Sequence, residues 1–75
     1  MNIGITDHAL ERMIERGVTE GDIRSAFLGP NEALPEEGPG KRKIMATLPK
    51  GDLVVVYSQE RGRKVIISAW WKNDA

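Results

Sequence analysis

The chain has 75 residues, one histidine and no cysteine, and its eleven basic and eleven acidic residues cancel at neutral pH. This length predicts one domain over residues 1–75 with a modest core. The lack of cysteine excludes disulfides and thiolate metal sites, and a single histidine argues against a zinc site, so no cofactor is expected. The neutral balance argues against the simplest nucleic-acid binder, which is basic overall, although bases gather locally at 41–43 and 61–64.

No targeting or membrane-spanning segment is visible in the sequence. The start lacks a basic region followed by an apolar run, so no signal peptide is expected. The longest apolar run, Leu53 to Tyr57, is far too short to cross a bilayer. Because a cysteine-free chain suits a reducing compartment, we expect a cytoplasmic location without membrane contact.

The stretch from Asp7 to Arg16 predicts an amphipathic helix, with Asp7 as its N-cap and Gly17 in the left-handed conformation that ends it. The residues expected to face the core are Ala9, Leu10, Met13 and Ile14. The opposite side carries His8, Glu11, Arg12, Glu15 and Arg16. His8 and Arg12 are four residues apart and are therefore neighbours on the polar face.

This polar face is the first candidate site. A histidine can act as a general base or acid near neutral pH, and Arg12 beside it could hold a phosphate oxygen. Arg16, one turn further, would extend the anion-binding surface. The alternative is a solvated helix face with weak ion pairs, since Glu11 and Glu15 crowd the same surface.

The segments next to this helix are less uniform. Thr19 and Asp22 predict a capping box that starts a second helix, which ends near Leu28. The segment Asn31–Gly40 has two prolines, two glycines and three glutamates and is predicted to be a loop. The segment Asn2–Ile5 is either a short edge strand or a frayed lead-in.

A period of two then predicts three strands, at Lys41–Leu48, Leu53–Gln59 and Lys64–Trp71, joined by short turns into an antiparallel meander. The middle strand has little polar alternation, so we expect it to be central and covered on both faces. The fold class is therefore α+β, with two helices packed on one face of a three-stranded sheet. Lys72–Ala75 is predicted to be a polar tail.

The sheet has a second face that is not fully polar. Alternation on the last strand places Ile66, Ser68 and Trp70 on one face and Ile67, Ala69 and Trp71 on the other. One tryptophan is therefore expected in the core, and the other at an interface or as a stacking residue. Such an apolar face indicates a protein partner or a homodimer, unless the predicted loop folds over it.

Further candidate residues lie on the strands. The bases Lys41, Arg42 and Lys43 could face the His8 surface across the domain, or could simply guard an edge strand. Tyr57 is either a core ring or an acid catalyst. No phosphate-binding loop, dinucleotide fingerprint or nucleophile elbow is present, so nucleotide hydrolysis, hydride transfer and serine-type acyl transfer lose support.

The run from Thr6 to Glu20 resembles the opening of a small bacterial family, domain of unknown function 4258 (DUF4258). Its helix motif, His-Ala-x-x-Arg-x-x-x-Arg-Gly, is matched by His8, Ala9, Arg12, Arg16 and Gly17. The resemblance covers nearly the whole chain and implies two helices, a loop and three strands. It also implies similarity to the RelE/ParE and BrnT toxins of toxin–antitoxin pairs, many of which are metal-independent ribonucleases.

The resemblance therefore implies RNA as substrate and an antitoxin as partner. His8 would act as base or acid, and Arg12 would hold phosphate, with Arg16 as a further phosphate-binding candidate. Lys41, Arg42 and Lys43 would extend the RNA surface. Two alternatives stay open. One is a protein-interaction module without catalysis that uses the sheet face, and the other is a nucleic-acid binder without cleavage.

Overall fold

The chain folds into two helices and a five-stranded sheet, in an α+β arrangement. The computed structural model describes residues 1–73 and their side chains, except that of Glu37, so Asp74 and Ala75 of the predicted tail lie outside the described residues. The elements are β1 (Asn2–Ile5), α1 (Asp7–Arg16), α2 (Glu20–Leu28), β2 (Glu32–Gly38), β3 (Lys41–Leu48), β4 (Gly51–Glu60) and β5 (Arg63–Trp71). Neither helix within residues 1–73 has the length and apolar character needed to cross a bilayer.

The sheet order is β1-β5-β4-β3-β2, so the predicted meander forms its centre, with one more strand at each edge. β1 settles the open question about Asn2–Ile5, because this segment pairs in parallel with the first half of β5. The prediction of a loop at Asn31–Gly40 is wrong, because most of it is β2, which pairs antiparallel with β3. Pro35 falls in the register shift of this edge strand, where a missing N–H is tolerated.

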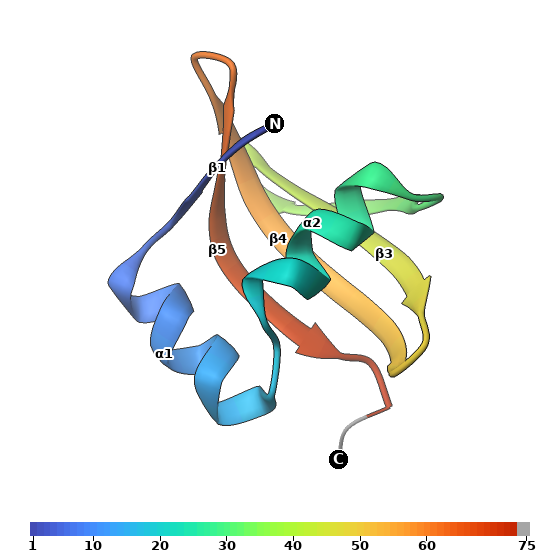
Figure 1. The fold of residues 1–75 in the computed structure, drawn as a ribbon. Helices are drawn as coiled ribbons and strands as arrows, with labels where there is room; N and C mark the ends of the chain where they lie inside the picture. The colour runs from blue at the N-terminus through green and yellow to red at the C-terminus, as the bar shows by residue number, and fades with distance from the viewer. Residues whose placement is uncertain (74–75) are drawn as a thin grey trace.

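Both helices pack on the same face of the sheet. α2 lies across β3 and β4, whereas α1 lies beside the second half of β5 (Figure 1). The core between them contains Ala9, Met13, Val18, Ile23, Ala26, Ile44, Ala46, Leu53, Val55, Tyr57, Ile66 and Ala69. β4 is buried throughout Leu53–Tyr57, which confirms its predicted central position.

The ends of the helices follow local chemistry, with one correction. The N-cap of α1 is Thr6 rather than Asp7, because the Ala9 N–H donates to Thr6 Oγ1 at 3.1 Å. Gly17 ends α1 with φ 68°, as predicted. The capping box of α2 is also confirmed: Thr19 N–H donates to Asp22 Oδ2 at 2.9 Å, and Asp22 N–H donates to Thr19 Oγ1 at 3.1 Å.

Only part of the predicted apolar stripe of α1 reaches the core. Ala9 and Met13 are buried, but Leu10 is 46% exposed and Ile14 is 71% exposed. The expectation that all four would be core residues is therefore wrong. α1 packs beside β5 at the side of the sheet, so the surface that covers its buried stripe is narrow.

A β-bulge in β5 changes which side chains face the helices. Val56 pairs with Ser68 and Tyr57 pairs with Ile66, so Ile67 has no partner on β4. The bulge puts Ile66, fully buried, in the same core as Ala69. The predicted alternation, which placed Ile66 on the opposite face with Trp70, is therefore wrong on that side of the bulge.

The Asp22 carboxylate makes helix stability depend on pH. Partial burial raises its pKa, but the Thr19 hydrogen bonds and Lys50, whose Nζ lies 3.0 Å from Asp22 Oδ2, outweigh this effect and leave the pKa below its ordinary value. A lowered pKa stabilises the fold above the unfolded-state pKa, and this stabilisation is lost as pH falls through the folded-state pKa. We expect Asp22→Asn to cost about 1 kcal/mol of unfolding free energy at neutral pH. In urea titrations, the difference from wild type should shrink on acidification below about pH 4.

The turn between β4 and β5 holds the one non-glycine residue with positive φ in the described chain. Arg61 has φ 43° and Gly62 has φ 78°, as in a two-residue hairpin turn with both central residues left-handed. Asparagine adopts this conformation more readily than arginine. We expect Arg61→Asn to raise the free energy of unfolding by up to about 1 kcal/mol in denaturant titrations. An unchanged midpoint would show that the turn is unstrained.

Candidate functional site

Three basic residues follow one flank of α1. His8, Arg12 and Arg16 are spaced four apart, and the first two are exposed while Arg16 is half-buried. Arg16 Nη1 donates to the carbonyl oxygen of Ala69 at 3.1 Å and to Ser68 Oγ at 3.4 Å. These bonds attach the flank to β5 and use only part of the five N–H donors of a guanidinium. Arg16 therefore holds the flank in place and keeps donors for an anion.

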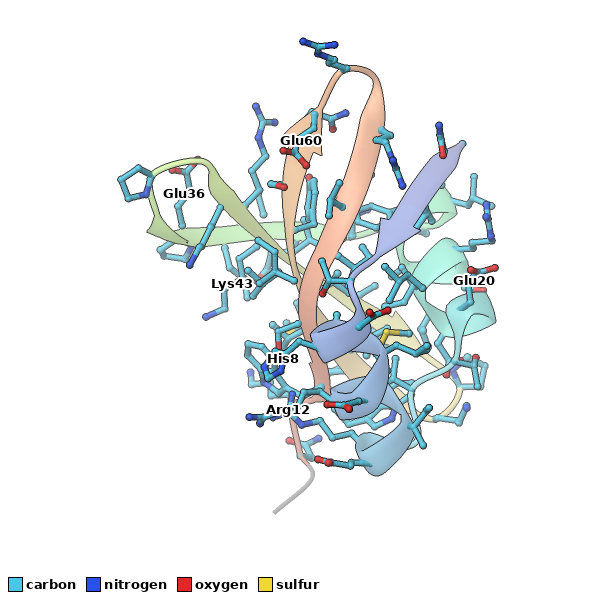
Figure 2. All side chains as sticks on the ribbon, turned by 90° about the vertical axis from the view of Figure 1, so that its left-hand side faces the viewer. His8, Arg12, Glu20, Glu36, Lys43 and Glu60 are labelled. Atoms are coloured by element: carbon cyan, nitrogen blue, oxygen red, sulfur yellow. The ribbon has the colours of Figure 1, made fainter. Side chains whose placement is uncertain are left out.

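His8 and Arg12 point away from the core. Within residues 1–73, neither side chain forms a hydrogen bond or an ion pair, and both project on the same side of β5 as Lys43 (Figure 2). Glu20 of α2 lies on the opposite side in the same view. The basic flank therefore borders the sheet face that the helices do not cover.

This uncovered side, called the open face below, is built by residues paired across β5, β4 and β3. Its central residues are Ser68, Trp70, Val56, Val54, Lys43 and Met45. Val54 and Val56 are each only 4% exposed although they lie outside the main core cluster. The centre of the open face is therefore apolar, and neighbouring side chains of the same face cover Val54 and Val56.

The two tryptophans lie on opposite sides of the sheet, as the alternation predicts. Trp71 packs against the core, and its Nε1 donates to the Gly17 carbonyl oxygen at 3.4 Å. Trp70 pairs with Val54 on the open face and is partly exposed. Lys43 Nζ lies 5.7 Å from the centroid of the Trp70 ring, in a cation–π contact.

The structure separates the other sequence-predicted residues. Tyr57 is buried on the helix side of the sheet, where its ring contacts Phe27 edge-on with the two ring centroids 4.9 Å apart. It therefore does not join the His8 surface. Lys41 and Arg42 are exposed, and alternation turns Arg42 to the side opposite Lys43. The open face thus collects the α1 flank, Lys43 and Trp70.

Two further features of the site bear on its chemistry. Glu11 and Glu15 are exposed, and no ion pair joins either to Arg12 within the described part of the chain. Within residues 1–73, no group of three or more acidic, histidine or cysteine side chains is arranged to hold a metal ion. Sequence reasoning did not identify Ser68 as the partner of Arg16, because a serine within an apolar strand carries no distinctive signal.

The fold and site define a small α+β domain in which a basic helix flank borders an open sheet face carrying one tryptophan. The chain belongs to the family described as Domain of unknown function (DUF4258), whose model matches residues 5–74. Comparisons with curated proteins and with solved structures gave no match.

Proposed function

We propose that this chain is a toxin-like domain that binds RNA in the cytoplasm and cleaves it without a metal cofactor. The observation that carries the proposal is the exposed pair His8 and Arg12, free of protein partners within residues 1–73, beside an open face that carries Lys43. A second reason is the helix motif that contains His8, Arg12 and Arg16, from which we infer a resemblance of this family to RelE/ParE and BrnT toxins. An antitoxin that covers the site would be the protein partner.

The proposed reaction is an internal phosphoryl transfer. The ribose 2′-oxygen attacks the adjacent phosphorus, the bond from phosphorus to the 5′-oxygen breaks, and a cyclic phosphate and a free 5′-hydroxyl result. A base takes the 2′-hydroxyl proton and an acid protonates the leaving oxygen. His8 supplies one of these transfers, and solvent supplies the other. Arg12, with the remaining donors of Arg16, stabilises the charge on the phosphorane oxygens.

The binding part of the proposal is tested with Arg12→Gln. We expect about tenfold weaker binding of a labelled RNA oligonucleotide, because a charged hydrogen bond to phosphate is lost. The slope of log affinity against log salt concentration should also fall by about 0.7. Fluorescence anisotropy over a salt series measures both quantities.

The matched control is Arg61→Asn, which removes one positive charge at the tip of the β4–β5 hairpin, away from α1 (Figure 1). This variant should bind RNA like wild type. Equal losses of RNA affinity in the two variants would show that the effect comes from net charge alone. An unchanged affinity in Arg12→Gln would show that Arg12 does not contact the RNA.

A second candidate function is supported by the exposure of Leu10 and Ile14 on α1. Exposed apolar side chains on one helix favour a non-catalytic module that binds a protein partner or a second copy of the chain. This alternative predicts concentration-dependent association in sedimentation and no effect on RNA. RNA cleavage by the purified chain would reject it as the sole function.

A further inference from the structure

Trp70 is the aromatic residue of the open face. It lies on β5 across from Val54, and Val54 and Val56, the neighbouring residues of β4 on the same face, are buried. Its ring is held by Lys43 yet stays partly exposed. Trp71 packs against the main core on the other side of the sheet, whereas Trp70 lies outside the core cluster.

The open face has a basic border beside this ring. Arg16 is bonded to Ser68, which precedes Trp70 by two residues on the same strand face, a separation of about 7 Å. Arg12 and His8 continue the border along α1, and Lys43 lies above the ring. At one end of β4, the carboxylate of Asp52 accepts a hydrogen bond from Thr47, whose Oγ1 lies 2.9 Å from Asp52 Oδ1.

From this arrangement we infer that the site takes single-stranded RNA, with one base stacked on Trp70 and its adjoining phosphate on the α1 flank. The inference rests on the proposed function and adds the strand state of the substrate. Every base has a flat face that stacks on an aromatic ring, but in a duplex this face is already occupied by neighbouring base pairs.

The first test uses the fluorescence of Trp70 alone. In full-length Trp71→Phe protein, Trp70 is the only tryptophan. We expect a single-stranded oligouridine to quench its emission with saturation, and a perfectly paired RNA duplex of the same length to leave it unchanged. Circular dichroism of the variant shows that the fold is retained.

The second test compares two substitutions at the same position. Trp70→Leu keeps an apolar side chain but removes the ring, and should weaken oligouridine binding roughly ten- to hundredfold, as loss of one stacked base does. Trp70→Phe keeps a ring and should recover much of the affinity. Neither substitution should change duplex binding.

The outcomes separate this inference from the proposed function. If oligouridine and duplex bind with equal affinity and Trp70→Leu binds like wild type, RNA binding stands and the stacking inference is wrong. If anisotropy detects no binding of either RNA, both are wrong. Quenching together with selective loss of single-strand affinity in Trp70→Leu supports both.

Discussion

Replacing His8 by asparagine should lower the rate of RNA cleavage by about 10²–10⁴-fold, because general acid–base catalysis by a positioned side chain contributes this much. Asparagine keeps a polar side chain of similar reach but cannot exchange a proton near neutral pH. Binding of RNA should change little, since Arg12 and Arg16 provide the charged contacts to phosphate. Single-turnover cleavage of a labelled oligonucleotide at saturating protein measures the effect separately from affinity.

The His8 prediction has a direct control in protein stability. His8 is exposed and has no hydrogen-bond partner within residues 1–73, so His8→Asn should shift the free energy of unfolding by less than about 0.5 kcal/mol. Cleavage that continues at the wild-type rate would show that His8 is not the acid–base group of the reaction.

The largest expected effect on stability comes from Ile66. This side chain is fully buried, because the bulge in β5 puts it in the core, and Ile66→Ala should cost about 2–5 kcal/mol. A chain of this length is expected to have only about 4–11 kcal/mol in total. The variant should therefore unfold at much lower urea concentration.

Ile67→Ala is the matched control, since it removes the same atoms from the next residue. Ile67 is only partly buried and has no partner on β4, so its loss should cost clearly less. Equal costs, or a larger cost at Ile67, would contradict the register around the bulge. Urea titrations of the two variants decide between these results.

The features that the sequence predicts well depend on neighbouring residues. Thr19 and Asp22 form their capping box because both partners lie within one turn, and Gly17 ends α1 because glycine tolerates the left-handed conformation. The apolar run in β4 predicts a central strand because few polar side chains interrupt it. The α+β class follows from these elements.

The features that sequence reasoning missed depend on distant segments. β2 contains Pro35 and several glutamates, which an edge strand tolerates, and it forms a strand because it pairs with the more distant segment β3. The burial of Ile66 depends on a bulge, which strict alternation cannot predict. Leu10 and Ile14 are exposed because α1 lies at the side of the sheet, a position that its own periodicity does not specify.

The candidate site shows the same division. The spacing of His8, Arg12 and Arg16 predicts a shared helix flank, which the structure contains. The sequence also offers Tyr57 as a candidate, but the strand register turns its ring into the core. The position of Trp70 on the same face as the anchor of Arg16 depends on the pairing of β5 with β4 and on the packing of α1.

The most direct test of the proposed function is induced expression in bacteria, with total RNA examined beside growth. Wild type, His8→Asn and the charge control Arg61→Asn are compared at matched protein levels. We expect growth arrest with cleaved RNA for wild type and Arg61→Asn, and continued growth with intact RNA for His8→Asn. Arrest with intact RNA, or equal RNA cleavage in His8→Asn, would contradict the proposal that this domain is a ribonuclease that uses His8.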